Sequence, residues 1–225
     1  MELTARLRLE THALHTMVER SVFMAALLRG QLTQPAYCLL LRNLEPIYQA
    51  LESGMVQHAR HPDIAAVLFR PLFRQHALHE DLAVLHGPTW REALGVVPAC
   101  TAYVARLHTL QDTHPSLLAA HAYVRYLGDL SGGQRLKIIV AKSLKLQDPP
   151  ADGPGFDSPR GTRFYDFGEP AEVARLAQAF RAGLDALTGD GVVAEAMLAF
   201  EMHGRLFDDL ALASGLPDNR LTASR

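Results

Sequence analysis

The sequence lacks several features that would identify large classes of protein. Its uninterrupted apolar runs fall far short of the roughly 18 residues that a membrane-spanning helix needs, so no such helix is expected. The amino terminus carries Glu2 and no apolar segment, which argues against a secretory signal and predicts a cytoplasmic location. The two cysteines, Cys38 and Cys100, form no CxxC or zinc-binding spacing, so a reduced, chemically quiet role is expected for them.

Charge of one sign is also missing. The chain has 22 Lys and Arg against 24 Asp and Glu, a formal net charge of −2, which excludes the electrostatic footprint of a general nucleic-acid binder. Only three of the cationic residues are lysines, a bias that genomic composition explains as readily as function. With 225 residues, 48% hydrophobic residues and a mean hydropathy of +0.02, the composition predicts one folded domain.

Common catalytic and nucleotide-binding motifs are absent as well. Residues 130–134 spell LSGGQ, the signature loop of ABC-transporter ATPases, but no GxxxxGK[ST] phosphate loop accompanies it. The sequence contains no GxGxxG, no βαβ pattern, no HExxH and no paired Glu-x-x-His that would hold a di-iron centre. We therefore treat the LSGGQ match as accidental.

Helical periodicity runs through most of the chain, without convincing strand-like alternation, and predicts an all-α domain over residues 1–215 with a loose tail at 216–225. Pro46 should kink or unwind its helix near residues 42–46, and residues 128–133 should interrupt the longest helical segment. Residues 147–169, rich in Gly and Pro, read as a loop. The expected helices are residues 4–28, 33–55, 71–86, 98–110, 115–146, 170–187 and 191–214.

Arg8, His12, His15 and Glu19 form the first notable constellation. They are spaced four, three and four residues apart, so on a helix they fall within roughly 60° of arc. One interpretation is a solvated face with ordinary i,i+4 pairs. The other is an iron site, in which His15 is the ligand and Glu19, one turn on, holds its second ring nitrogen.

The second constellation surrounds three glycines, Gly128, Gly132 and Gly133. Each glycine inside a helix costs about 1 kcal/mol relative to alanine, so the three cost roughly 3 kcal/mol that something must offset. Gly128 and Gly132 are four residues apart and strip one helix face of side chains, which lets a flat ligand approach the backbone. A plain break between two helices is the alternative, although Arg125 and Asp129 flank the gap.

Together these motifs resemble the heme oxygenases over roughly residues 6–210. The resemblance implies a single-domain multi-helix bundle in which heme lies sandwiched between a proximal helix and a kinked distal helix. The resemblance is carried by these segments: residues 14–16 with Glu19, 48–52, 80–83 with 87–88, 120–123, 126–134, 180–181 and 200–207.

The same resemblance implies roles for individual residues. His15 would be the axial ligand of heme b, which is substrate and cofactor together, and Glu19 would accept a hydrogen bond from its other ring nitrogen. Asp129 would organise distal water, with Tyr48, Glu52 and Arg125 behind it. The other implied heme contacts are Arg8, Tyr123 and Arg181 at the propionates, His12 where the family often has lysine, His203 where it can carry asparagine, and Gly128, Ser131, Gly132, Phe200 and Phe207.

The implied activity is cleavage of heme, by O2 and electrons from an external reductase or ferredoxin, into biliverdin, carbon monoxide and ferrous iron. Because the chain ends without an apolar tail, the soluble bacterial type without a membrane anchor is expected. Two alternatives remain open. A heme carrier or sensor that does not degrade heme would share His15 and the glycines, but gives no reason for Asp129. A zinc protein would use His76, His79 and His86.

Overall fold

The computed structural model describes residues 1–147, 160–187 and 191–217. Most of the tail expected at 216–225, and about half of the expected loop at 147–169, lie outside these residues. The predicted all-α fold is confirmed: the described residues contain helices and no strand. The elements are α1 (Leu3–Glu19), α2 (Val22–Leu28), α3 (Gln34–Gln57), α4 (Pro62–Val67), η1 (Arg70–Leu72), α5 (Gln75–Leu85), α6 (Trp90–Ala93), α7 (Pro98–Thr113), η2 (Pro115–Leu117), α8 (Leu118–Ala122), η3 (Tyr123–Leu127), α9 (Gly128–Ser143), η4 (Arg163–Tyr165), α10 (Pro170–Asp185) and α11 (Val192–Ala213).

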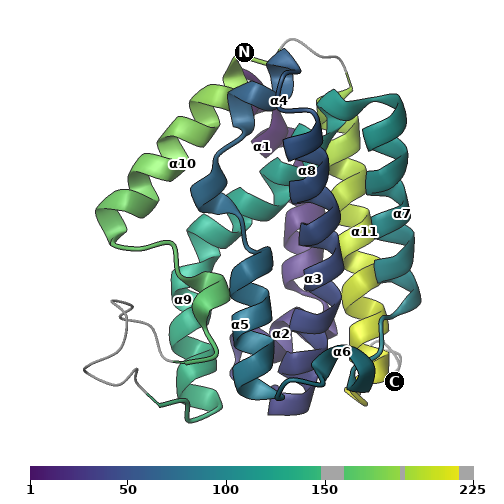
Figure 1. Cartoon of the computed structure of the whole chain (residues 1–225), viewed down its shortest axis with the longest axis vertical. Coiled ribbons are helices and arrows are strands. Elements are labelled where there is room, and N and C mark those ends of the chain that lie inside the picture. Colours follow the sequence, from purple (N-terminus) through teal and green to yellow (C-terminus); the bar gives the residue numbers. More distant parts are fainter. Residues whose placement is uncertain (148–159, 188–190, 218–225) are drawn as a thin grey trace.

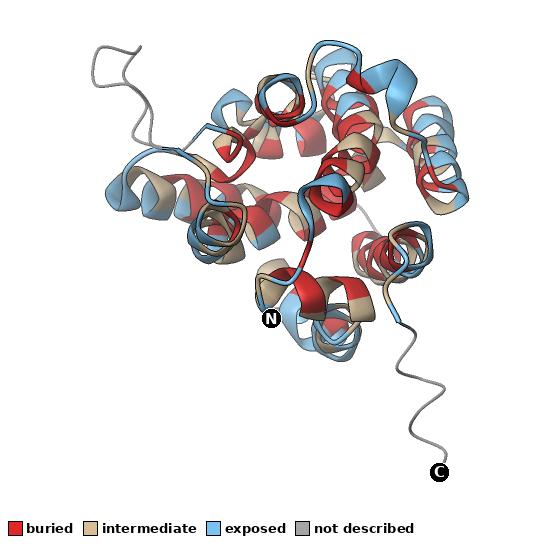
Figure 2. Ribbon diagram, turned by 90° about the horizontal axis from the view of Figure 1, so that it is seen from below, coloured by how far each residue is buried: buried red, intermediate tan, exposed pale blue. Residues whose placement is uncertain are grey.

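Helix α3 is the central element of the bundle (Figure 1). Thr33 caps its start by accepting a hydrogen bond from the Ala36 N–H at 3.4 Å, and Pro35 occupies the first turn, where a missing N–H costs nothing. Apolar residues three and four apart along α3 are buried against α5 and α7, so this helix organises the core. In Figure 2 the buried residues face inward and the exposed ones outward.

The first predicted helix, 4–28, is in fact two helices. The chain breaks after Glu19, and the Ser21 side chain then caps α2 by accepting a hydrogen bond from the Met24 N–H at 3.4 Å. The prediction of one helix failed because both helices bury apolar residues against the same bundle, so the apolar periodicity continues across the break. The Ser21 cap starts a new helix at this point. Helix α1 packs mainly on α11 and buries only Leu7 and Thr11, so its polar stripe stays accessible.

The unwinding expected at Pro46 and the break expected at residues 128–133 are both absent from the described helices. Helix α3 runs unbroken through Pro46 and is not unwound there. The glycines at 128–133 do not interrupt the segment, because all three lie within α9 and Gly128 has ordinary helical angles, φ −61° and ψ −48°. The irregularity lies one turn earlier, in η3, where five residues form a π-helical turn. Such wide turns recur at functional sites because they change the direction of the side chains that follow.

None of the helices in the described ranges is long and apolar enough to cross a membrane. Close packing joins α10 to α4, where a Cβ added to Gly183 would lie 2.0 Å from the Ala66 carbonyl oxygen. The expected helix at 71–86 is divided, because η1 ends at Leu72 and α5 begins at Gln75. Helices α7, α10 and α11 otherwise follow the expected segments within about three residues at each end.

Candidate functional site

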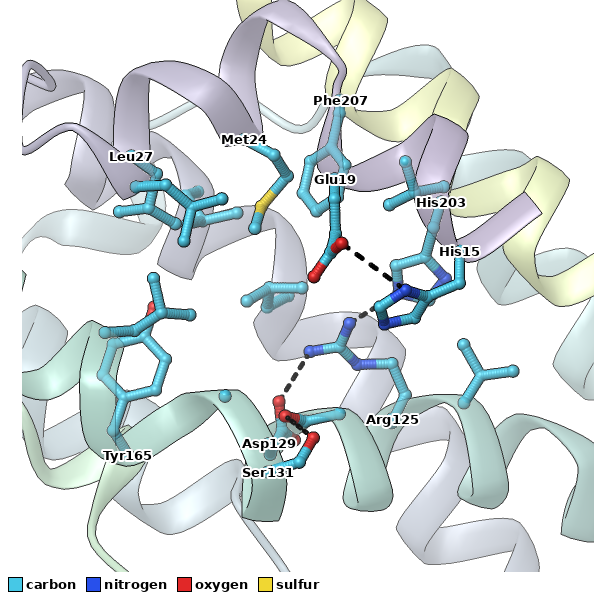
Figure 3. A pocket seen from close by; sticks show the side chains of 18 of the residues that line it. His15, Glu19, Met24, Leu27, Arg125, Asp129, Ser131, Tyr165, His203 and Phe207 are labelled. Atoms are coloured by element: carbon cyan, nitrogen blue, oxygen red, sulfur yellow. Dashed lines mark hydrogen bonds and ion pairs between the residues drawn. The ribbon is translucent and has the colours of Figure 1, made fainter. Parts of the chain in front are cut away.

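A cavity opens between the polar stripe of α1 and the start of α9 (Figure 3). It consists of two adjoining hollows of about 360 Å³ and 650 Å³, within the size range of small-molecule sites. The first reaches inward to α2, α3 and α11, and the second opens toward Arg8 and Arg181. Six residues line both hollows: His15, Glu19, Val124, Gly128, Ser131 and Phe200.

Helix α1 contributes His15 and Glu19 to one wall of the cavity. The His15 Nδ1 lies 3.7 Å from the Glu19 Oε2, and both side chains are about half exposed. The ring edge of His15 also packs on Phe200, with centroids 5.7 Å apart. No described residue forms a hydrogen bond with the His15 Nε2 atom, and the ring points into the cavity in Figure 3. This nitrogen is therefore free to ligate a metal.

The opposite wall is a bare helix backbone. A Cβ added to Gly128 or Gly132 would meet no atom within 4 Å, and both glycines line the cavity. Gly133 differs, because a Cβ there would lie 3.4 Å from the Tyr165 ring, in ordinary van der Waals contact. No side chain projects from the backbone at Gly128 and Gly132, so this wall offers an open face to a flat ligand.

Asp129 lies on the same wall and is held by two donors. Its Oδ2 accepts a short hydrogen bond from the Tyr48 hydroxyl, and its Oδ1 accepts from Arg125 Nη2 at 3.1 Å. Arg125 also donates from Nε to the Tyr48 oxygen at 2.9 Å and from Nη1 to His203 Nε2 at 2.8 Å. Four side chains from α3, η3, α9 and α11 thus form one buried network beside the cavity.

Burial and charge act against each other in this network. Burial raises the pKa of Asp129 above its ordinary value, although the Arg125 charge and the Tyr48 hydrogen bond act to lower it. Burial alone would lower the pKa of Arg125, but Tyr48 and Asp129 raise it overall, so the guanidinium stays charged. Burial and the nearby Arg125 charge lower the pKa of His203 well below its ordinary value. His203 is therefore neutral at physiological pH.

Glu52 does not join the network as expected. It lies one turn beyond Tyr48 on α3, but its carboxylate accepts hydrogen bonds from the backbone N–H groups of Arg74 and Gln75, where α5 begins. Among the described residues it forms no hydrogen bond with Asp129. Burial raises the Glu52 pKa from 4.5 to about 7, although the two backbone donors lower it. The resemblance placed Glu52 by its position on α3, whereas the nearby helix start decides its direction.

The other predicted residues gather around the cavity. Ser131, Phe200, His203 and Phe207 line the first hollow, and its remaining wall includes Met24, Leu27, Leu40, Phe164 and Tyr165, which sequence reasoning did not single out. Their only sequence signal was core-like spacing. The second hollow holds the expected cationic and polar groups Arg8, His12, Tyr123 and Arg181.

The proposed zinc ligands are not brought together. His76 pairs with Glu80 at 3.2 Å, and His79 with Glu45 at 2.7 Å. No group of three His, Cys, Asp or Glu side chains within the described part of the chain is arranged to hold a metal ion. The zinc alternative therefore has no site there.

Sequence reasoning missed a second set of hydrogen-bonded side chains, which lies behind the cavity. The Tyr103 hydroxyl lies 3.0 Å from His121 Nδ1, and His121 Nε2 lies 2.9 Å from Glu195 Oε1. Arg106 binds the same carboxylate through Nε at 3.0 Å. No sequence pattern predicts this hydrogen-bonded set, because its members come from α7, α8 and α11 with no shared spacing.

Known proteins of one family match the chain along most of its length. A family model described as heme oxygenase matches residues 1–209. Heme oxygenase 1 of Nostoc sp. is 37% identical over 213 residues, covering 92% of this chain and 85% of the relative. Human heme oxygenase 1 is 38% identical over 215 residues, covering 93% and 72%.

Solved structures agree with the sequence matches. The crystal structure of heme oxygenase-2 from Synechocystis sp. in complex with heme and NO has a TM-score of 0.85 and 34% identity, covering 95% of this chain and 87% of that chain. Heme oxygenase-1 from the same cyanobacterium, in complex with heme, has a TM-score of 0.82 and 32% identity, covering 100% and 99%.

Proposed function

The chain belongs to the heme oxygenase family and is an enzyme that degrades heme, and from this premise we propose how its own residues cleave heme into biliverdin, carbon monoxide and ferrous iron. Heme b is the substrate. When bound, its iron supplies the centre at which O2 and electrons from an external reductase or ferredoxin react. The observation that carries the proposal is the cavity with His15 on one wall and bare glycine backbone on the other.

We assign His15 Nε2 as the axial ligand of the iron. This atom has no protein partner among the described residues, while Nδ1 faces Glu19 at 3.7 Å. A carboxylate at the second ring nitrogen fixes the tautomer and makes the imidazole a stronger ligand. A shortening of this contact to hydrogen-bond distance on heme binding would complete the arrangement.

On the other side, Gly128 and Gly132 let the helix backbone cover the porphyrin face, and Asp129 holds water there. Both Asp129 oxygens accept hydrogen bonds from the protein, so the carboxylate is fixed and orients water by accepting from it. The close backbone leaves room for reaction toward one edge of the ring only. Tyr48 and Arg125 act through Asp129.

At the open edge, the second hollow offers partners for the two propionates. Arg8 and Arg181 provide charge and Tyr123 a hydroxyl, and His12 lies on the same face of α1. Arginine binds carboxylates in a bidentate manner, which sets the rotation of the ring in the cavity. The rotation in turn decides which ring edge faces the distal wall.

The alternative of a carrier that binds heme without degrading it is disfavoured by the family match and by the buried Asp129 network, which simple binding does not need. Purified protein mixed with hemin, a reductant and air should lose the Soret band and form a bilin spectrum. A stable Soret band under these conditions would instead support the carrier.

His15→Ala tests the iron ligand in the same assay. We expect loss of the histidine-ligated spectrum and of biliverdin formation, with partial recovery when imidazole is added. His76→Ala is the matched control, since this histidine is 87% exposed on α5. An unchanged coordination spectrum in His15→Ala would refute the assignment.

A further inference from the structure

His203 has a different partner at each ring nitrogen. Its Nδ1 lies 2.9 Å from the Ala199 carbonyl oxygen, and its Nε2 lies 2.8 Å from Arg125 Nη1. A carbonyl can only accept a hydrogen bond and a guanidinium can only donate one. One form of the ring satisfies both: neutral imidazole with its proton on Nδ1 and a lone pair on Nε2. The backbone of α11 thus sets the tautomer that Arg125 needs.

Arg125 distributes its donors among three acceptors. Nε donates to Tyr48, Nη2 to Asp129 and Nη1 to His203. These contacts fix the plane of the guanidinium. Because Arg125 is largely buried, with 12% of its side chain exposed, an Nη1 group without an acceptor would drive the side chain to rotate. Rotation would release the Oδ1 atom of Asp129.

The imidazole plane is itself held from outside the network. The Tyr103 ring stands edge-on to it at 5.0 Å and 89°, and Phe207 lies at 6.2 Å and 62°. The Tyr103 hydroxyl donates to His121 Nδ1, because His121 Nε2 donates to the Glu195 carboxylate. The hydrogen bonds from His121 and Arg106 overcome the effect of burial and lower the Glu195 pKa to about 2, so this carboxylate stays ionised. The hydrogen bonds from Glu195 through His121 to Tyr103 therefore fix the Tyr103 ring, which contacts His203.

We infer that His203 is a positioning residue whose neutral imidazole accepts from Arg125, keeps it on Asp129 and so fixes the carboxylate that faces the substrate. The inference rests on the proposed function, because Asp129 matters only if it orders the distal side of heme. His203, Arg125 and Asp129 all line the first hollow, so a change at His203 reaches the site without altering the His15 wall. The low pKa of His203 agrees with this role, since a charged ring would repel the guanidinium.

Two variants separate the acceptor from the bulk of the ring. His203→Gln keeps an amide oxygen that can reach the position of Nε2, whereas His203→Met has a similar length and only a weak thioether acceptor. His79→Met is the control for removal of a histidine, because His79 pairs with Glu45 and lies outside the network. Each protein is loaded with hemin and compared with the parent chain.

Three quantities are measured: the heme dissociation constant, the rate of biliverdin formation, and the pH at the midpoint of the pH-dependent change in the visible spectrum of the ferric heme complex. His203→Met should bind heme within about threefold of the parent, lose about tenfold in rate, as is typical when the partner of a site residue is removed, and shift the pH midpoint. His203→Gln should recover both the rate and the pH midpoint of the parent. An unchanged midpoint and rate in His203→Met, or a Gln variant as impaired as the Met variant, would overturn the inference.

A measurement on the unaltered chain keeps the test independent of variant folding. Nitrogen-15 NMR of the imidazoles should show His203 neutral with its proton on Nδ1 throughout the pH range of activity. A proton on Nε2, or a charged ring, would overturn the inference. If the parent chain fails to form biliverdin, the proposed function is wrong. If it forms biliverdin and His203→Met does so equally well, only the role of His203 is lost.

Discussion

Asp129 is buried, yet its surroundings require a carboxylate. Tyr48 and Arg125 both donate to it, and a protonated acid would leave one of these donors without an acceptor. With both oxygens engaged, Asp129 is fitted to orient a water molecule more than to release a proton itself. The contribution of this residue to heme cleavage therefore depends on its two hydrogen bonds as much as on its charge.

Asp129→Asn tests this role at the smallest change of shape. The amide nitrogen cannot accept from the Tyr48 hydroxyl, so we expect the biliverdin rate to fall by about 10- to 100-fold while heme affinity stays close to that of the parent. Single-turnover spectra measure the biliverdin rate, and hemin titration measures the heme affinity. Asp112→Asn, at an exposed aspartate of α7, is the control. A parental rate in Asp129→Asn would contradict the assignment.

Glu52 leads to a prediction about stability. Its pKa is raised from 4.5 to about 7 in the folded chain, mainly by burial, so the folded state holds this proton more tightly than the unfolded state. The contribution of Glu52 to the free energy of unfolding is then fully present below about pH 4.5 and is lost as the pH rises to about 7. The pKa difference corresponds to roughly 3 kcal/mol.

Glu52→Gln removes this titration while keeping an oxygen for the N–H groups at the start of α5. The free energy of unfolding of the variant, relative to the parent, should therefore rise between about pH 4.5 and pH 7. Urea unfolding at several pH values measures it, with the exposed Glu92→Gln as control. A difference that is flat with pH, or that falls, would show that Glu52 is not held in its protonated form.

The glycines of helix α9 differ in their surroundings. Gly128 and Gly132 face open space on the cavity side, whereas a Cβ at Gly133 would contact the Tyr165 ring at 3.4 Å. The π-helical turn η3 comes immediately before them and carries Arg125. The element thus presents a bare backbone and a charged network to the same cavity, at the cost of about 1 kcal/mol of helix stability for each glycine.

Gly128→Leu should therefore have opposite effects on stability and binding. Leucine is the better helix former, so the protein without heme should gain about 0.5–1 kcal/mol in free energy of unfolding. The new side chain projects into the cavity, so heme affinity should fall by about tenfold or more, about 1.4 kcal/mol. Hemin titration and urea unfolding give the two values. Gly95→Leu, which also meets only open space but lies outside the cavity, should leave heme affinity unchanged; undiminished heme binding by Gly128→Leu would mean that heme does not lie over this face.

For the whole molecule, the cavity results from how separate helices are stacked. Its walls come from α1, α2, α3, η3, α9, η4, α10 and α11, and the Tyr48–Asp129 contact joins residues 81 positions apart. Helix α1 is held mainly by α11 and buries little of its own surface, so the wall with His15 is the more exposed of the two. The wall with Asp129 is supported by hydrogen bonds among side chains from four elements.

The sequence by itself determined the helical class, the polar stripe of α1 and the bare face of α9, because each depends on the period of 3.6 residues within one helix. The order of the motifs also identified the family. Only the tertiary structure decided that Glu52 turns to the start of α5 and that His203 meets Arg125. Hydrogen bonds between distant segments have no period in the sequence, so their partners are fixed only when the helices pack and each buried polar group has to find a donor or an acceptor.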